Sequence, residues 1–217
     1  MLDQINDISE TCKVKNIVNT LIDLKVNNTV FDTHIFTKVD LSSLVNKYDH
    51  VKLVKNLDDG QSYFFDLTEN LILRSLKIDD YERDYLRLLE QLTTVGEDVT
   101  KEKFEEKFYK MKSCLNSYFI LVIEDLKTNK IVGTATLVDE QKFIRHASSR
   151  GRVEDVVVDN RYRGKKLGKL LIDFAIGLSK VLGCYQVSLE CRDHVKTFYQ
   201  QFGFQFEDKQ NYLCRKK

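Results

Sequence analysis

The sequence has few residues of the types that build disulfide frameworks and metal sites. The chain of 217 residues contains five cysteines but no CxxC pair, which argues against both a disulfide framework and a structural zinc site. Its four histidines show no HxxxH or HExxH spacing, so we expect no catalytic metal. Proline is absent as well, an absence that by itself excludes nothing. We therefore expect reduced thiols and no metal ion.

Long hydrophobic runs and an excess of charge are also missing. No stretch reaches the roughly 18 apolar residues of a membrane span, and the first residues lack the features of a signal peptide. Lys and Arg total 34 against 33 Asp and Glu, so the chain has no global field that attracts nucleic acid or a membrane surface. We predict a cytoplasmic protein with no nucleic-acid or membrane partner, in which any anion site is local.

The length and the hydrophobic content of 42% allow one substantial core with an added segment. Residues 1–65 contain one glycine and no clear turn chemistry, and we interpret them as an N-terminal extension of unknown role. Within it, residues 31–45 are interpreted as an arm that packs either on the body or on a partner subunit. Residues 66–217 form the predicted functional domain.

From residue 71 onward, the hydrophobic pattern predicts an α/β fold with a sheet that is antiparallel at first and ends in a strand-helix-strand unit. A long helix that starts near Gly164 has an apolar stripe of 3.6-residue period that would bury one face on a sheet. Strands are expected over 71–77, 118–126, 131–138, 151–159 and 185–191 and as a last pair within 204–216, and helices near 85–92, 104–111, 164–178 and 195–201.

The segment 161–169, Arg-Tyr-Arg-Gly-Lys-Lys-Leu-Gly-Lys, lies between a predicted strand and the long helix. The free N–H groups of a helix start, with basic side chains around them, suit phosphate oxygens. An ordinary helix start with a solvated basic face fits the same residues equally well. The GxxxxGK[ST] spacing of a P-loop is absent, and the GxGxxG of a Rossmann turn is absent too.

This turn resembles the acetyl-CoA signature R/Q-x-x-G-x-G/A of the GCN5-related N-acetyltransferases (GNAT), with Lys166 at the inner glycine position, where a negative φ would leave its N–H available. Several further segments resemble the eukaryotic glucosamine 6-phosphate N-acetyltransferases within that superfamily. They follow one another in collinear order between residues 71 and 217: QLTTVG, EQKFI, GRVEDVVV, RGKKLGKLL, CYQVSLEC, FYQQFGF and NYLCR.

The resemblance implies an α/β (α+β) GNAT fold, in which a mixed central sheet is splayed around acetyl-CoA and flanked by helices. It implies acetyl transfer from acetyl-CoA to the amine of glucosamine 6-phosphate by direct attack on the thioester, within UDP-N-acetylglucosamine synthesis. It also implies a homodimer with sugar sites near the subunit interface. The cofactor residues it implies are Val156, Val157, Val158, Arg163, Gly164, Lys165, Lys166, Leu167, Gly168 and Lys169.

The resemblance also implies a sugar-phosphate pocket, and this chain departs from the family pattern at two points near the ligands. Arg145 stands where the family usually has histidine, here displaced to His146, and residues 194–197 read His-Val-Lys-Thr where Asn-Val is common. The implied substrate residues are Thr93, Lys142, Phe143, Ile144, Arg145, Glu154, Asp155, Glu190 and Arg215.

Direct acetyl transfer needs a neutral amine, an oriented thioester and a group that protonates the departing thiolate. Tyr199 on the last predicted helix suits the role of acid, although aromatic residues at helix positions usually serve packing. Glu190 at the end of a strand can orient or deprotonate the amine. Adjacent strand residues point to opposite faces, so at most one of Glu154 and Asp155 is expected to enter the pocket. Ion pairs that tie the elements together are the alternative role of all three carboxylates.

The stretch from Lys142 to Arg152 is basic and has no acidic residue, which is typical of a solvated face and also suits a dianionic phosphate. Two other functions stay open. One is acetylation of a protein N-terminus or of a lysine side chain, and the other is a CoA-binding regulatory module without turnover.

Overall fold

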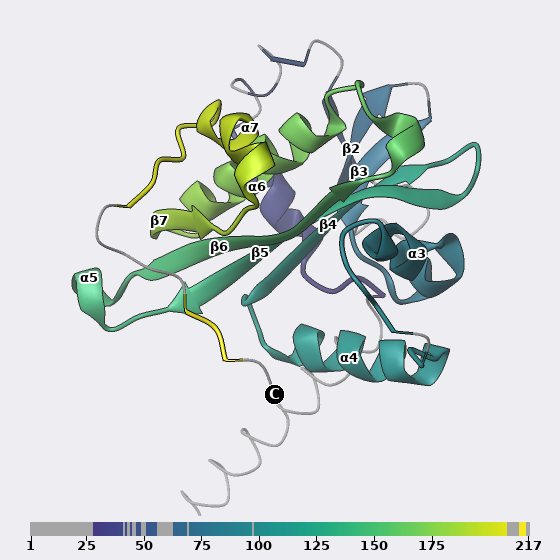
Figure 1. Cartoon of the computed structure of the whole chain (residues 1–217), viewed down its shortest axis with the longest axis horizontal. Helices are drawn as coiled ribbons and strands as arrows, with labels where there is room; N and C mark the ends of the chain where they lie inside the picture. Colours follow the sequence, from purple (N-terminus) through teal and green to yellow (C-terminus); the bar gives the residue numbers. More distant parts are fainter. Residues whose placement is uncertain are drawn as a thin grey trace, which may run out of the picture.

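The structure is a computed structural model of the whole chain. It describes residues 28–40, 42, 44, 47–48, 51–55, 63–68, 70–96, 98–207 and 213–215. Within these residues, one mixed sheet of seven strands runs in sequence order from β1 to β7 (Figure 1). Every neighbouring pair is antiparallel except β6 and β7, which are parallel. The strands are β1 (Lys52–Lys55), β2 (Tyr63–Thr68), β3 (Leu71–Ser75), β4 (Tyr118–Asp125), β5 (Lys130–Gln141), β6 (Ser149–Val158) and β7 (Cys184–Leu189).

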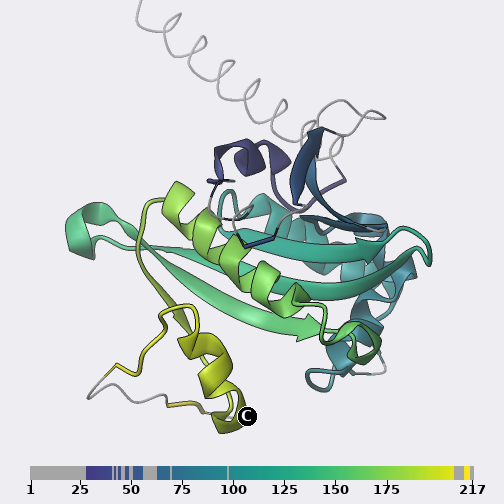
Figure 2. The same cartoon turned by 90° about the horizontal axis from the view of Figure 1, so that it is seen from above.

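Helices cover both faces of this sheet. Figures 1 and 2 show α6 and α7 on one face and α3 and α4 on the other. No helix in the described ranges is long and apolar enough to cross a membrane. The α-helices are α3 (Tyr85–Glu90), α4 (Lys101–Ser113), α5 (Ile144–Ala147), α6 (Leu167–Val181) and α7 (Lys196–Gln200), and the short 3-10 helices are η1 (Thr33–Lys38), η2 (Ile78–Arg83), η3 (Asn160–Tyr162) and η4 (Asp193–Val195).

The predicted apolar stripe of α6 is confirmed, because each of its side chains is almost fully buried. Phe174 and Leu178 have no exposed surface, and the helix packs on β5, β6 and β7. The antiparallel pair β4 and β5 is the predicted hairpin, joined by the turn at 126–129. The mixed sheet with flanking helices confirms the predicted α/β fold class.

The described part of residues 1–65 belongs to the core of this same chain. The Phe36 side chain of η1 and the Phe65 side chain of β2 are fully buried, and the Phe65 ring lies 4.1 Å from the Phe174 ring of α6, centroid to centroid. Strands β1 and β2 extend the sheet beyond β3. The expected boundary after residue 65 therefore falls inside β2, while residues 1–27 lie outside the described residues.

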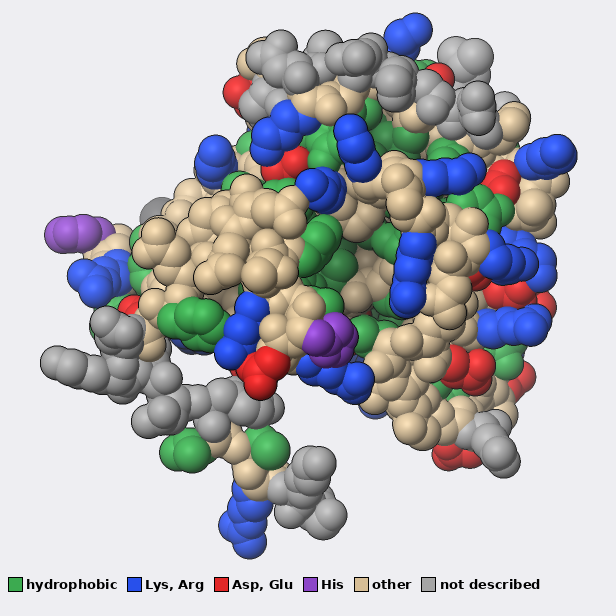
Figure 3. All heavy atoms as spheres, turned by 45° about the horizontal axis from the view of Figure 1, so that its top comes forward, with side chains coloured by type: hydrophobic (Ala, Val, Ile, Leu, Met, Phe, Trp, Pro, Cys, Tyr) green, Lys and Arg blue, Asp and Glu red, His purple; other side chains and the backbone are tan. Residues whose placement is uncertain are grey.

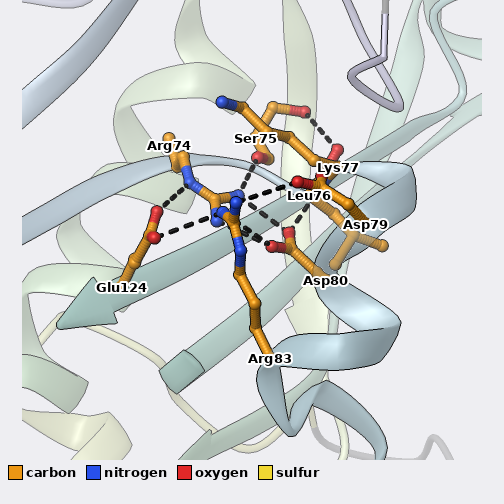
Figure 4. A network of polar contacts seen from close by, with 8 residues as sticks. All are labelled: Arg74, Ser75, Leu76, Lys77, Asp79, Asp80, Arg83 and Glu124. Carbon is orange, nitrogen blue, oxygen red and sulfur yellow. Dashed lines mark hydrogen bonds and ion pairs between the residues drawn. The ribbon is translucent and has the colours of Figure 1, made fainter. Parts of the chain in front are cut away.

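A buried ionic network fixes β3, β4 and η2 to one another (Figure 4). Arg74 donates from its two terminal nitrogens to the two oxygens of Asp80, at 2.8 and 2.7 Å, and from Nε to Glu124 at 2.7 Å. Arg83 adds a second donor to Glu124 at 3.2 Å. Arg74, Asp80 and Glu124 are at most 5% exposed, so their charges are stabilised by one another rather than by water.

The strand pair expected within 204–216 is wrong for the residues that the structure describes there. Residues 204–207 and 213–215 have no strand conformation, and the rest of that segment lies outside the described residues. In the described part of the chain, β7 pairs only with β6. An alternating pattern becomes a strand only when a partner edge lies alongside it, and these residues have none within the described chain.

Candidate active site

The parallel strands β6 and β7 separate part-way along the sheet. Their pairing ends at the rung that joins Val153 to Leu189, whereas β6 continues to Val158. Residues 154–158 therefore present an edge that β7 does not cover. Phe198 of α7 lies near the far end of this opening, since a Cβ built on Gly168 of α6 would be 3.6 Å from the Phe198 ring and 3.8 Å from Val158.

The backbone of β6 offers hydrogen-bonding groups at this open edge. Asp159 N donates to Val132 O of β5 at 2.9 Å. Backbone groups alternate in direction along a strand, so Val158 directs its N–H and C=O away from β5, into the opening. An extended ligand with amide groups can pair with this edge as an additional strand would.

A β-bulge interrupts β6 at the start of this opening. The register with β5 shifts between Thr134 and Thr136, and Asp155 has a φ of 51°, in the left-handed region. The bulge interrupts the regular alternation of side chains at Asp155, and the expectation that at most one of Glu154 and Asp155 enters the pocket stays a prediction. A bulge turns the side chains that follow it and is common beside functional sites.

The basic glycine turn connects β6 to α6 and is exposed. Gly164 and Lys166 both have left-handed backbone conformations, with φ of 83° and 62°. The condition of a negative φ at Lys166 is thus not met, and Lys166 caps α6, its carbonyl accepting a hydrogen bond from Leu170 N at 3.1 Å. The first N–H groups of this 15-residue helix point toward the turn, as an anion site requires.

Two residues hold the start of this turn in place. Asp159 accepts hydrogen bonds from Arg161 N at 2.8 Å and from the Arg161 guanidinium at 2.7 Å. These bonds, led by the guanidinium contact, lower the pKa of Asp159 to about 2. Gln91, which follows α3, donates to Asp159 at 3.3 Å and accepts from Asn160 N at 3.0 Å, so it ties the loop after α3 to the turn.

Tyr199 and Glu190 line one cavity of about 530 Å³ between β7, α7 and residues 203–207. Tyr199 is half-buried, and its ring packs against Phe198, with the centroids 5.0 Å apart, and against Phe204, at 6.2 Å. Its hydroxyl makes no hydrogen bond with any residue that the structure describes. Burial, and to a lesser extent the neighbouring Cys191, raises the pKa of Tyr199, so the hydroxyl keeps its proton at neutral pH. A proton donor in a cavity needs this protonation state.

Arg152 is the site residue that the sequence did not single out. Its Nε lies 2.7 Å from Glu154 Oε1, and its NH2 group lies 2.6 Å from Glu190 Oε1. Arg152 pairs with Ser188 across β6 and β7, one rung before the strands separate. It therefore joins the two carboxylates on either side of the opening. The basic run that contains Arg152 was visible in the sequence, but its ion-pair partners, Glu154 and Glu190, lie 2 and 38 positions further along the chain.

Comparison with known proteins identifies this arrangement. The sequence profile of the Acetyltransferase (GNAT) family matches residues 79–204, which is more than half of the chain. The chain belongs to the GNAT acetyltransferase family. The family resemblance seen in the motifs is thereby confirmed. The glycine turn at 163–169 and the separating strands β6 and β7 all lie inside the matched region.

Named relatives of this GNAT chain share much of its sequence. It is 48% identical over 132 residues to a probable glucosamine 6-phosphate N-acetyltransferase of Drosophila melanogaster, covering 61% of this chain and 59% of the relative. It is 39% identical over 137 residues to the glucosamine 6-phosphate N-acetyltransferase of Arabidopsis thaliana, covering 63% of this chain and 91% of the relative. The match thus spans nearly all of the plant protein but less than two thirds of the fly protein.

Solved structures agree with the sequence comparison. The crystal structure of glucosamine-6-phosphate N-acetyltransferase from Arabidopsis thaliana superposes with a TM-score of 0.63 at 38% identity, covering 67% of this chain and 99% of that one. An acetyltransferase structure from Trypanosoma brucei superposes with a TM-score of 0.61 at 32% identity, covering 67% and 99%. Both cover the GNAT body and leave about a third of this chain unmatched.

The predicted substrate residues of this GNAT chain do not gather in one place within a single chain. Ile144 and Arg145 lie in α5 and Phe143 directly precedes it, at the end of the β5–β6 hairpin that projects from the body (Figures 1 and 2). All three are exposed, and Phe143 is 101% exposed. Lys142 beside them pairs with Glu140 at 2.9 Å, and Arg150 pairs with the same carboxylate at 2.8 Å.

The remaining predicted residues come from three other segments. Thr93 lies in the exposed loop after α3. Arg215 is exposed and makes no hydrogen bond or ion pair with another described residue. Asp155 lies at the β-bulge of β6, and its charge contributes, after burial, to the raised pKa of Tyr85. Burial raises the pKa of Asp155 itself.

The surface over the site is hollowed. Figure 3 shows hydrophobic side chains in the depth of a hollow and Lys and Arg side chains along its border. In the described ranges, no group of three or more His, Cys, Asp or Glu side chains is arranged to hold a metal ion. Apolar depth and a basic border suit a long ligand with an uncharged arm and a phosphorylated end.

Proposed function

We propose that this chain transfers the acetyl group of acetyl-CoA to the amine of glucosamine 6-phosphate, giving N-acetylglucosamine 6-phosphate and CoA. The observation that carries the proposal is the name that relatives share at 38–48% identity. Family membership supports acetyl transfer, and the names of the relatives support the amino-sugar substrate. The product would serve UDP-N-acetylglucosamine synthesis.

The residues around the opening fit acetyl-CoA. The open edge of Val156, Val157 and Val158 can pair with the amides of the pantetheine arm. The exposed turn from Arg163 to Lys169, with the N–H groups of α6, can hold the pyrophosphate. No metal takes part in this proposal, because positioning and proton transfer by side chains are sufficient for attack by an amine on a thioester.

The proposed reaction is a direct attack. The amine nitrogen forms the bond to the thioester carbon, the carbon–sulfur bond breaks, and the sulfur leaves as a thiolate. Tyr199 donates its hydroxyl proton to that thiolate; its raised pKa means that the hydroxyl carries this proton at neutral pH before the thiolate leaves. Glu190 accepts the proton that the amine loses, and Arg152, at 2.6 Å, holds the Glu190 carboxylate in position.

The sugar phosphate is proposed to lie among the residues taken from the family resemblance. In this proposal Lys142 and Arg215 hold the phosphate, and Glu154 lies close to the amine. The remaining contacts would come from Thr93, Phe143, Ile144, Arg145 and Asp155.

We also propose a homodimer, because the α5 tip is poorly stabilised in one chain. Arg145, His146 and Ala147 have φ values of 56°, 61° and 54°, and left-handed backbone costs about 1–2 kcal/mol per residue. Phe143 and Ile144 beside them are exposed. A second subunit that covers this tip would offset both costs. It would also bring the substrate residues of the tip close to the active site of that second subunit.

The dimer is tested by light scattering coupled to gel filtration. We expect the parent protein to have the mass of two chains and Phe143→Asp to have the mass of one, with unchanged helical circular dichroism. A parent protein that stays monomeric up to high micromolar concentration would contradict the dimer.

A cytoplasmic location is part of the same proposal. The described cysteines, Cys114, Cys184, Cys191 and Cys214, are all free thiols, as is usual in a reducing compartment. Imaging of the tagged full-length chain tests it, and a signal confined to the secretory pathway would refute it.

The activity is tested by CoA thiol release with acetyl-CoA and a panel of acceptors. The panel contains glucosamine 6-phosphate, glucosamine, other amino sugars and lysine peptides. We expect kcat/KM for glucosamine 6-phosphate to exceed every other value. Faster turnover of a lysine peptide would favour protein acetylation, and no release with any acceptor would favour a CoA-binding module.

A further inference from the structure

A second cavity lies beside the basic turn, on the side of α6 that faces the N-terminal part of the chain. Its volume is about 640 Å³, within the range of small-molecule sites. One wall comes from Tyr48, Val51, Leu67, Asn70 and Leu71, which lie outside the matched family region of 79–204. The rest of the lining comes from the hairpin residues Asp125 and Lys127, of which Asp125 pairs with Leu71 across β3 and β4, and from Arg161, Tyr162, Lys165, Lys166, Leu167 and Leu170.

This cavity differs from the opening between β6 and β7. Gly168 faces Phe198 of α7 and Val158, which border the opening. Leu167 and Leu170, on the same helix turn, line the second cavity. The start of α6 therefore separates the two spaces, and Lys165, Lys166 and Leu167 belong to both the proposed cofactor turn and the second cavity.

The depth of the cavity is apolar and contains two anchored aromatic rings. Val51, Leu67 and Leu170 are at most 6% exposed. The Tyr48 hydroxyl donates to Asp173 at 3.0 Å, and burial followed by the Asp173 charge raises the pKa of Tyr48, so the ring carries no charge. The Tyr162 hydroxyl donates to Asp125. Rings held at their hydroxyls are fixed in orientation, and a ring face that no other group covers can stack on a flat ligand.

The border of the cavity has an excess of positive charge. Among the described residues, Lys127, Lys165 and Lys166 have no carboxylate within ion-pair distance. Lys165 Nζ lies 5.5 Å from the centroid of the Tyr162 ring.

The carboxylate in the lining, Asp125, is already engaged. It accepts from the Tyr162 hydroxyl and, at 2.9 Å, from Lys127 N. Burial alone would raise the pKa of Asp125, but these hydrogen bonds lower it, so it stays charged and cannot take a ligand proton. In a chain of net charge +1, three ammonium groups around one cavity with no carboxylate partner among the described residues favour a dianion or trianion at that place.

We propose that this cavity binds a nucleoside diphosphate, with the base against the tyrosine rings and the apolar wall and the phosphates among the three lysines. A flat heterocycle matches two aromatic faces, and two phosphates match several point charges better than one phosphate does. The binding step does not depend on the acetyl transfer proposed above.

The test is isothermal titration of the full chain with UDP, CDP and GDP, and with inorganic pyrophosphate as a ligand that lacks the base. ADP is left out because it is part of CoA and would also enter the cofactor opening. Two charge-reversal variants are compared with the parent. Lys127→Glu changes the cavity from its hairpin side, and Lys169→Glu makes the same change of charge on α6 outside the cavity lining.

We expect at least one nucleotide to bind more tightly than pyrophosphate. Lys127→Glu should weaken that binding by about tenfold or more, the scale of one lost charge-assisted hydrogen bond. Lys169→Glu should leave it within about twofold. Three results would overturn the proposal: no nucleotide binds at millimolar concentration, pyrophosphate binds as tightly as every nucleotide, or Lys169→Glu weakens binding as much as Lys127→Glu. These titrations measure binding only, so a protein that showed no acetyl transfer in a separate assay would give the same test of nucleotide binding.

Discussion

Replacing Asp80 by asparagine should destabilise the protein strongly although it changes few atoms. Asp80 is fully buried and accepts both terminal nitrogens of Arg74, and its Oδ2 also accepts Lys77 N at 2.8 Å. Asparagine keeps the shape but loses the charge, and its NH2 group faces the guanidinium. Arg74 is then left with the carboxylate of Glu124, which it shares with Arg83, while Arg83 also pairs with Asp79 at 2.8 Å (Figure 4).

The magnitude follows from burial. Breaking a buried ion pair by removing one partner costs about 3–5 kcal/mol, because the other charge is left uncompensated. For a chain of this length each kcal/mol lowers Tm by roughly 2–4 °C, so we expect a fall of about 6–20 °C. Urea unfolding should show a lower midpoint with an unchanged m-value.

The control is Glu82→Gln, which breaks the exposed ion pair between Glu82 and Lys101 on the same side of the molecule. Exposed pairs contribute little, so this variant should unfold almost as the parent does. A second variant, Asp80→Asn combined with Arg74→Met, removes the stranded charge and should recover part of the lost stability. If Asp80→Asn unfolds at the same midpoint as Glu82→Gln, the buried network does not stabilise the fold.

Three further changes test the site. Tyr199→Phe should lower kcat about 100-fold or more with little change in the KM of acetyl-CoA. Because burial raises the pKa of Tyr199, the parent enzyme should keep its activity up to at least the ordinary tyrosine pKa. An unchanged kcat, measured where the chemical step is rate-limiting, would mean that Tyr199 is only a packing residue. Arg215→Ala should raise the KM of glucosamine 6-phosphate, with a loss of binding free energy on the order of 2 kcal/mol, and Arg215→Lys should have a KM between those of the parent and of Arg215→Ala. An unchanged preference for glucosamine 6-phosphate over glucosamine would refute the phosphate contact. The pKa of Asp159 is lowered to about 2, so the contribution of this carboxylate to stability is present above its ordinary pKa and is lost as the pH falls toward 2. In Asp159→Asn, Tm should therefore decrease less between about pH 4 and pH 2 than it does in the parent. An equal decrease in both proteins would contradict the lowered pKa of Asp159.

The sequence predicted the elements whose signal is local. The stripe of α6, the apolar runs of β4 and β6, and the glycine turn each lie within about 15 consecutive residues, and their periodicity reports which face will be buried. The motifs were also sufficient to indicate the GNAT family. Tyr199 and Glu190 were each singled out as candidate catalytic residues from their own element; the structure has both on the lining of one cavity, and their catalytic roles stay a prediction.

Contacts between residues far apart in the chain were decided only by the tertiary structure. Tyr48 reaches Asp173 across 125 positions, and nothing local in residues 1–65 signals that β1 and β2 will continue the sheet. The bulge at Asp155 arises from the register with β5, and the Arg152 pairs arise where β7 begins to separate. Periodicity records the faces of one element, whereas strand register, bulges and ion pairs depend on which distant element packs against it.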